Sequence, residues 1–252
     1  MIENLQWWQW LLGIGAAFFV GFTKTGIPGL AILAVPLMAM TVGNAKASVP
    51  VLLPLLIVAD IFAVGRYHRQ AQWNRLVPLF WPLAAGMVVG VGIIKTMPEP
   101  FFKIFIGAIA IIMLAIHSWR KVMDQKKIPD GLFFAVFIGT VAGIATTAAN
   151  AAGPVLAIYL ISMRMEKKNF IGTAACFFIL VNVAKIPIYG FAGLFTKSGL
   201  ILDLCLALPV LVGIATGFAI FKKIPEKLFE RIILLLTFVA SARLLISGIM
   251  ML

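Results

Sequence analysis

Eight apolar runs, separated by short polar connections, restrict most strongly what this chain can fold into. Six of them have the length of single membrane-spanning helices, which need about 20 apolar residues each; they cover residues 47–65, 76–96, 101–119, 170–195, 200–221 and 227–250. The other two, 6–43 and 131–163, are interrupted near 23–28 and 146–154 by glycine, proline and polar residues. Charged residues make up 12% of the sequence, against about 25% in soluble domains. The sequence therefore predicts an all-α polytopic membrane protein.

The order of one broken run followed by three single helices occurs twice along the chain. Five residues recur 127 positions later: Pro82, Gly86, Gly90, Pro98 and Glu99. The breaks align at an offset of 124, which places Gly29 on Gly153. We predict two repeats, residues 1–124 and 125–252, within one membrane domain. The G-x-x-x-G pairs are expected to serve close helix packing, and an exposed pair would permit a homodimer.

Positively charged loops predict how the repeats sit in the membrane. If each broken run is a hairpin, the loops 66–75, 119–130, 163–169 and 221–231 share one side and carry three, four, three and four Lys or Arg residues, fourteen in all. Because Lys and Arg gather in cytoplasmic loops, we predict a multi-pass protein of the bacterial inner (plasma) membrane with these loops in the cytoplasm. Each repeat then crosses three times, so the second is inverted relative to the first. Inverted repeats with broken helices are typical of secondary transporters.

Both breaks combine small residues with polar ones. The first contains Thr23, Lys24, Thr25, Gly26, Pro28 and Gly29, and the second contains Thr146, Thr147, Asn150, Gly153 and Pro154. Glycine permits sharp bends and proline suits the first turn of a helix, so each break is predicted to end one half-helix and begin another. Half-helix N-termini attract anions, and a lysine inside an apolar run is costly unless it is used. The breaks therefore predict an anion site that contains Lys24.

Three further ionisable residues lie within predicted helices: Asp60, Lys185 and Arg243. Asp60 and Lys185 are expected either to pair with each other or to act separately, with Asp60 carrying a proton and Lys185 meeting the substrate. Asn182 shares a helix face with Lys185, and Tyr189 either extends that face or lies at the interface. Arg243 is expected to snorkel to the interface or to neutralise carbonyls, with substrate contact as the alternative.

The sequence argues against several other classes of function. The net charge of +12 is explained by the positive loops, so we expect no nucleic acid partner. Cys176 and Cys205 have no partner at metal-ligand spacing, and we expect neither a metal nor a cofactor. The chain has no H-E-x-x-H motif and no serine or cysteine with a plausible nearby base, so we do not expect an enzyme.

The chain resembles the TauE/SafE family of membrane anion transporters over nearly its whole length, in the stretches GFTKTGIPGLAILAVPL, AKASVPVLLPLLIVADIFAVGRY, AGPVLAIYL and IGTAACFFILVNVAKIPIY. The resemblance implies export of sulfite and small organosulfur anions such as sulfoacetate, driven by the proton gradient. It also implies a substrate region formed by the two breaks. Many family members have a more glycine-rich first break without lysine, so Lys24 marks a departure that bears on the substrate.

We therefore predict a proton-coupled secondary transporter that exports small anions such as sulfite or organosulfonates by alternating access around the breaks. An anion channel and a carrier of a non-sulfur carboxylate are the alternatives. The predicted substrate-binding residues are Lys24, Thr25, Gly26, Gly29, Asn150, Gly153, Asn182 and Lys185. Asp60 is the candidate for proton coupling, and the further candidates are Thr23, Thr147, Tyr189 and Arg243. The expected partners are a small anion, protons and the lipid bilayer.

Overall fold

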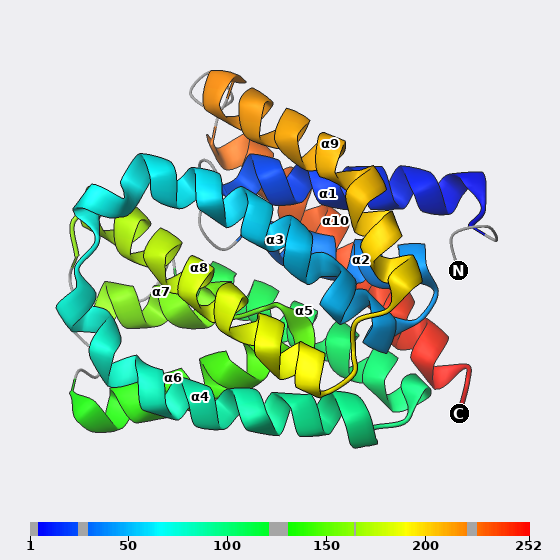
Figure 1. Ribbon diagram of the computed structural model, residues 1–252, viewed down its shortest axis with the longest axis horizontal. Coiled ribbons are helices and arrows are strands. Elements are labelled where there is room, and N and C mark those ends of the chain that lie inside the picture. The colour runs from blue at the N-terminus through cyan, green and yellow to red at the C-terminus, as the bar shows by residue number, and fades with distance from the viewer. Residues whose placement is uncertain (1–4, 25–29, 121–130, 164, 221–225) are drawn as a thin grey trace.

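The computed structural model describes residues 5–24, 30–120, 131–163, 165–220 and 226–252. In these ranges the chain forms α-helices and short 3-10 segments, with no β-strand (Figure 1). The first broken run gives α1 (Trp7–Lys24), η2 (Leu30–Leu33) and α2 (Ala34–Val42), and the second gives α6 (Leu132–Ala149) and α7 (Gly153–Ser162). The single helices are α3 (Ala45–Tyr67), α4 (Trp73–Thr96), α5 (Glu99–Arg120), α8 (Lys167–Phe191), α9 (Lys197–Ile220) and α10 (Glu226–Ile249), with η3 (His68–Gln70) after α3.

Six helices of the described chain are long and apolar enough to cross a membrane: α3 with η3, α4, α5, α6, α8 and α9. This confirms an all-α protein with several membrane spans. Among the described residues, the distribution differs in two respects from the sequence prediction. The helix α10, predicted as a single span, is not among the six, whereas α6, predicted as one arm of a hairpin, is. With 18 residues at about 1.5 Å each, α6 is long enough to cover most of a hydrocarbon layer, whereas its continuation α7 has only 10 residues. The second broken run therefore has one long arm and one short arm.

The chain folds back on itself at both breaks. Near the start of α1, the Gln9 side chain donates a hydrogen bond of 2.9 Å to the carbonyl of Thr41, near the end of α2. In the second run, the Tyr159 hydroxyl of α7 donates to the Arg75 carbonyl at the start of α4. The early part of α6 lies along the same helix, with Gly139 against the Leu79 carbonyl. Within each broken run, the second arm therefore returns to the end of the bundle from which the first arm started.

Two helix pairs with close backbone contact lie on opposite sides of the bundle: α1 with α9, and α4 with α6 (Figure 1). At Gly21 of α1, an added Cβ would collide with the Val210 carbonyl of α9. Likewise, at Gly143 of α6, it would collide with the Leu83 carbonyl of α4. Each of these contacts therefore joins one predicted repeat to the other.

The G-x-x-x-G glycines serve this packing inside one chain. Gly86 faces the Thr140 carbonyl of α6, and Gly213 faces the Phe18 carbonyl of α1. Only a residue without a Cβ permits such an approach between helix backbones. Because these surfaces are already covered, the motif provides no support for a homodimer.

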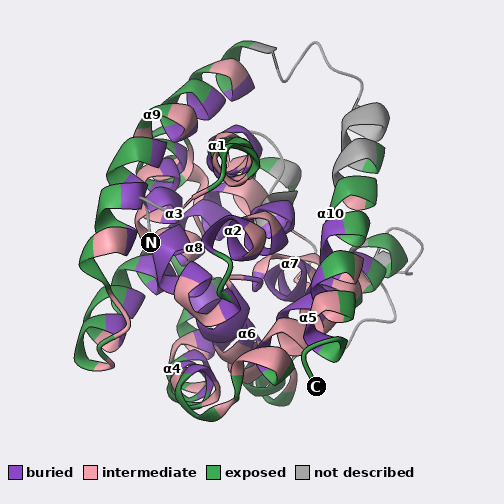
Figure 2. Ribbon diagram, turned by 90° about the vertical axis from the view of Figure 1, so that its right-hand side faces the viewer, coloured by how far each residue is buried: buried purple, intermediate pink, exposed green. Residues whose placement is uncertain are grey.

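The centre of the bundle is formed by α3 and α8, which pack against each other. Figure 2 shows buried residues concentrated on the inner faces of the helices and exposed residues on the outer faces. Many exposed residues are large and apolar, among them Trp81, Phe133, Phe191 and Leu204. Large apolar side chains over the exterior are expected of a protein surrounded by lipid.

Candidate functional site: a buried charged cluster at the helix breaks

The second break ends one helix and begins another within three residues. Asn150 follows the last residue of α6 and has a positive φ of 50°, which asparagine tolerates better than most residues. Its backbone N–H donates to the carbonyls of Ala145 and Thr146 and so caps α6. Gly153 then begins α7, with Pro154 in its first turn. As predicted, the break ends one helix and begins another, but Asn150 rather than glycine adopts the turn conformation. Gly153 and Pro154 form the first turn of α7, and the asparagine side chain faces the neighbouring helices.

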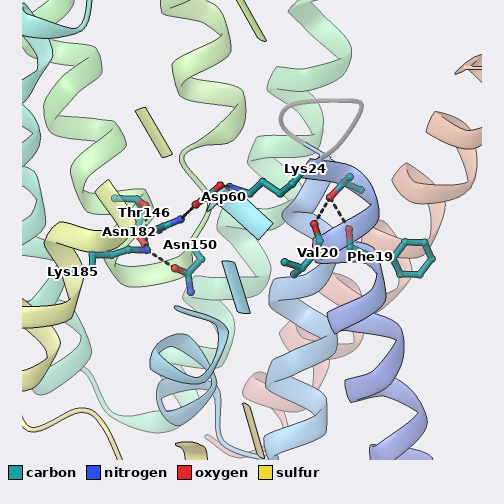
Figure 3. A network of polar contacts seen from close by, with 9 residues as sticks. Phe19, Val20, Lys24, Asp60, Thr146, Asn150, Asn182 and Lys185 are labelled. Carbon is teal, nitrogen blue, oxygen red and sulfur yellow. Dashed lines mark hydrogen bonds and ion pairs between the residues drawn. The ribbon is translucent and has the colours of Figure 1, made fainter. Parts of the chain in front are cut away.

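Asp60 lies in the middle of the bundle on α3 and is fully buried. Its carboxylate accepts two hydrogen bonds: Lys24 Nζ is 2.5 Å from Oδ1, and Asn182 Nδ2 is 2.6 Å from Oδ2. Figure 3 shows the two donors reaching the carboxylate from opposite sides. Lys24 is the last residue of α1. Its Nζ also lies 4.1 Å from the centre of the Phe178 ring. An ion pair thus joins the first break to the two central helices.

Lys185 lies close to this pair on α8 but has different partners. It is fully buried, and its Nζ donates to Asn150 Oδ1 at 2.6 Å and to the carbonyl and hydroxyl oxygens of Thr146 at 3.2 and 3.4 Å (Figure 3). The Thr146 carbonyl belongs to the last turn of α6, where the helix dipole favours a cation. In the described chain no carboxylate lies within ion-pair distance of Lys185. Among the described residues, neutral oxygens are therefore the hydrogen-bond partners of its Nζ.

The partners of Lys185 are fixed in turn. Asn150 Nδ2 donates to the carbonyl of Val49 on α3 at 2.9 Å. One turn beyond Lys185, the buried hydroxyl of Tyr189 donates to the Thr147 carbonyl at 2.6 Å. The second break is thus tied to both central helices.

A cavity with about 50 Å³ of room for water-sized molecules adjoins the cluster. It is lined by Thr23, Lys24, Ile32, Leu56, Asp60, Ala63, Tyr67, Thr146, Asn150, Ala151, Gly153, Pro154, Ile171, Ala174, Ala175, Phe178 and Asn182. One water needs about 10–15 Å³ on this measure, so a few waters or one compact anion fit. The lining reaches Tyr67, the last residue of α3, and Ile171, near the start of α8. The cavity therefore extends from the breaks toward the end of the bundle where these helices meet.

The structure brings most of the predicted site residues together. Six of them line the cavity: Thr23, Lys24, Asp60, Asn150, Gly153 and Asn182. Three lie just behind the lining: Thr147, Lys185 and Tyr189. Thr25, Gly26 and Gly29 lie outside the described residues. Arg243 is exposed on α10, with its guanidinium carbon 5.9 Å from the centre of the Trp8 ring, and does not line the cavity.

Two lining residues with side chains suited to a ligand were missed by the sequence analysis, Phe178 and Tyr67. Phe178 precedes Asn182 by four residues, so positions 178, 182, 185 and 189 form one stripe along α8. That spacing would have identified it. In the described chain, no group of three or more His, Cys, Asp or Glu side chains could hold a metal ion.

A family model described as "Sulfite exporter TauE/SafE" matches residues 13–244. The chain belongs to the TauE/SafE family. No curated protein and no solved structure matches it. The matched residues include both breaks and all the described residues of the charged cluster. As a TauE/SafE member with six apolar helices, the chain is a multi-pass membrane protein of a transporter family.

Proposed function

We propose that this TauE/SafE protein is a proton-coupled secondary transporter that exports small anions of the sulfite and organosulfonate type. The anion binds at the two breaks, between Lys24 and the Lys185–Asn150 pair. The two halves of the chain, as inverted repeats, move relative to each other and expose this site to each side of the membrane in turn. The loops at 66–75 and 163–169 face the cytoplasm.

One observation carries the proposal: the central cluster contains two lysines and only one carboxylate among the described residues. Lys24 is matched by Asp60, whereas Lys185 is fully buried and held only by neutral oxygens. An isolated ammonium group in a low-dielectric interior is costly, and buried charges are normally paired. A negatively charged ligand in the adjoining cavity would supply the missing counter-charge.

The arrangement of the helices supports the transport mechanism. Corresponding glycine contacts join α1 to α9 and α4 to α6, which is the reciprocal pattern that two related halves would produce. The cavity extends toward the ends of α3 and α8 that adjoin loops 66–75 and 163–169. At the other end, the Tyr189 and Asn150 hydrogen bonds hold α8, α3 and the second break together. With the basic loops in the cytoplasm, this is the geometry of a site open to the inside.

The test is uptake into proteoliposomes of sulfite, sulfoacetate and malonate, each with and without an imposed pH gradient. Malonate carries a carboxylate where sulfoacetate carries a sulfonate, so the pair separates sulfur anions from carboxylates. Saturable sulfite or sulfoacetate uptake that the gradient accelerates, and that Lys185→Met abolishes, is expected. Lys95→Met is the matched control, because Lys95 is exposed in the last turn of α4.

Other results would point elsewhere. Rapid flux of all three anions without saturation would indicate a channel, because channels and carriers share this electrostatics and differ in turnover. Preference for malonate would indicate a carboxylate carrier. Unchanged uptake in folded Lys185→Met would remove the buried lysine from the site.

A further inference from the structure

The carboxylate of Asp60 occupies the place that an anion would take in this cluster. It lines the cavity wall together with its two donors, Lys24 and Asn182. Lys24 and Asn182 come from different elements, and both line the cavity. The Nζ and Nδ2 groups that now donate to Asp60 could therefore donate to a bound anion instead (Figure 3). The Asp60 carboxylate thus occupies hydrogen-bond donors to which an anionic ligand would also bind.

The charge of the cluster depends on whether Asp60 is ionised. When all three groups are ionised, the cluster of Lys24, Lys185 and Asp60 carries +1, because it contains two lysines and one carboxylate. If Asp60 takes up a proton, the same three residues carry +2. A carboxylate that loses its cation in a low-dielectric interior neutralises rather than remaining charged.

We propose, on the basis of the function proposed above, that the substrate displaces Asp60 from Lys24 and that Asp60 then binds one proton from the cavity water. The loaded site is neutral when it holds a doubly charged anion. The substrate class is therefore a compact dianionic oxyanion that binds together with one proton. In the empty site Asp60 returns to Lys24, so the unloaded cluster keeps only one uncompensated charge.

Among the described residues near Asp60, Lys185 is the other buried group that can change its charge, and it lies behind the cavity lining. Among the residues that line the cavity, the other ionisable ones are Lys24 and Tyr67. Of the elements packed on α3, α8 presents Lys185, while α2 and α6 contain no ionisable residue. Asp203 of α9 lines a separate pocket with Thr196.

Two of the remaining elements packed on α3 place a charged group at one of its ends. From α5, Glu99 accepts a hydrogen bond from the Ala45 N–H at the start of α3. His68 and Arg69 belong to η3, after the end of α3. The ionic state of the cavity therefore depends on Asp60.

The test measures proton uptake during anion binding by calorimetry of the full-length protein in buffers with different ionisation enthalpies, at mildly alkaline pH. The probes are sulfate and sulfite, both mainly dianions there, and methanesulfonate, a monoanion of similar shape. The variants are Asp60→Asn, which fixes the neutral state, and Asp203→Asn, a matched acid outside the cavity.

For the wild type and Asp203→Asn, we expect uptake of about one proton per dianion bound and an affinity that rises by up to about tenfold for each unit by which the pH falls. Asp60→Asn is expected to bind sulfate or sulfite without proton uptake and with little pH dependence. Methanesulfonate should bind the wild type with less proton uptake than the dianions.

Three results would overturn the inference: dianion binding by the wild type without proton uptake, proton uptake that persists in Asp60→Asn, or binding of methanesulfonate alone. Such results together with saturable sulfite flux would leave the transport function intact. Proton-linked binding of dianions without any flux would instead contradict transport and support the role of Asp60. A circular dichroism spectrum and melting curve establish that Asp60→Asn is folded.

Discussion

Removing Lys24 should leave the buried Asp60 without its cation, and the size of the effect follows from the geometry of the pair. In Lys24→Met, Asp60 keeps only the Asn182 amide as a bonded donor, and its side chain is fully buried. Breaking a buried ion pair from one side costs about 3–5 kcal/mol. At roughly 2–4 °C per kcal/mol for a chain of this size, the melting temperature should fall by roughly 6–20 °C.

The substitution Asp60→Asn, which removes the other partner, should lower the stability less, because the two side chains are not equally buried. The Lys24 side chain is 10% exposed and lines the cavity, so water can reach its ammonium group after Asp60→Asn. The Phe178 ring also remains beneath it. We expect a loss of about 1 kcal/mol, the value of one ordinary hydrogen bond.

The double variant Lys24→Met/Asp60→Asn separates the interaction energy of the ion pair from the cost of leaving one partner alone. It contains neither charge, and replacing both members of a buried pair is often nearly neutral. Its melting temperature should therefore lie above that of Lys24→Met. Thermal unfolding of the four purified proteins in detergent, followed by circular dichroism, measures this. Equal stability of Lys24→Met and the wild type, or a double variant less stable than Lys24→Met, would refute the reasoning.

Three further substitutions test the packing and the second break. Gly86→Leu should prevent folding, because its Cβ would meet helix backbone, whereas Gly92→Leu has open space and should express normally; size-exclusion chromatography distinguishes them. Asn150→Gly and Asn150→Ala should both weaken sulfite binding, since both lose the amide that holds the buried lysine, but only Ala adds about 1 kcal/mol of left-handed strain in thermal unfolding. Tyr189→Phe should lower stability by about 1–3 kcal/mol, because the Thr147 carbonyl loses its donor; an unchanged melting curve would contradict this.

The positions of the helices could be predicted from the sequence because apolar length and the placement of glycine and proline determine them locally. As predicted, α1 ends at Lys24 and α6 ends just before Asn150. The residue types at these positions favour a chain reversal and a helix end. Pairing across the bundle was harder. The sequence offered Lys185 as a partner for Asp60, but the carboxylate pairs with Lys24, 36 residues earlier. That choice depends on where α1 ends relative to α3, which no local pattern specifies.

The alignment of the two predicted repeats likewise could not be fixed from local sequence patterns. Matching the break residues Gly29 and Gly153 gave an offset of 124, whereas the backbone contacts of Gly21 and Gly143 correspond at 122. Helix packing and break sequence therefore do not share one register. The sequence analysis also considered only the N-terminal ends of the half-helices as electrostatic features. The C-terminal end of α6 proved equally important, because its Thr146 carbonyl helps to hold Lys185.

The two central lysines differ in a way that bears on how a carrier could use them. Lys185 is fully buried, and its partners Asn150 and Thr146 belong to the second break, so its charge is a fixed property of that region. Lys24 ends α1, reaches the cavity and, among the described residues, bonds to the Asp60 carboxylate of α3. Only Lys24 can therefore change its partner without disrupting a helix cap. A ligand that draws Lys24 away from Asp60 would also loosen the link between the first break and α3, which couples anion binding to the position of α1.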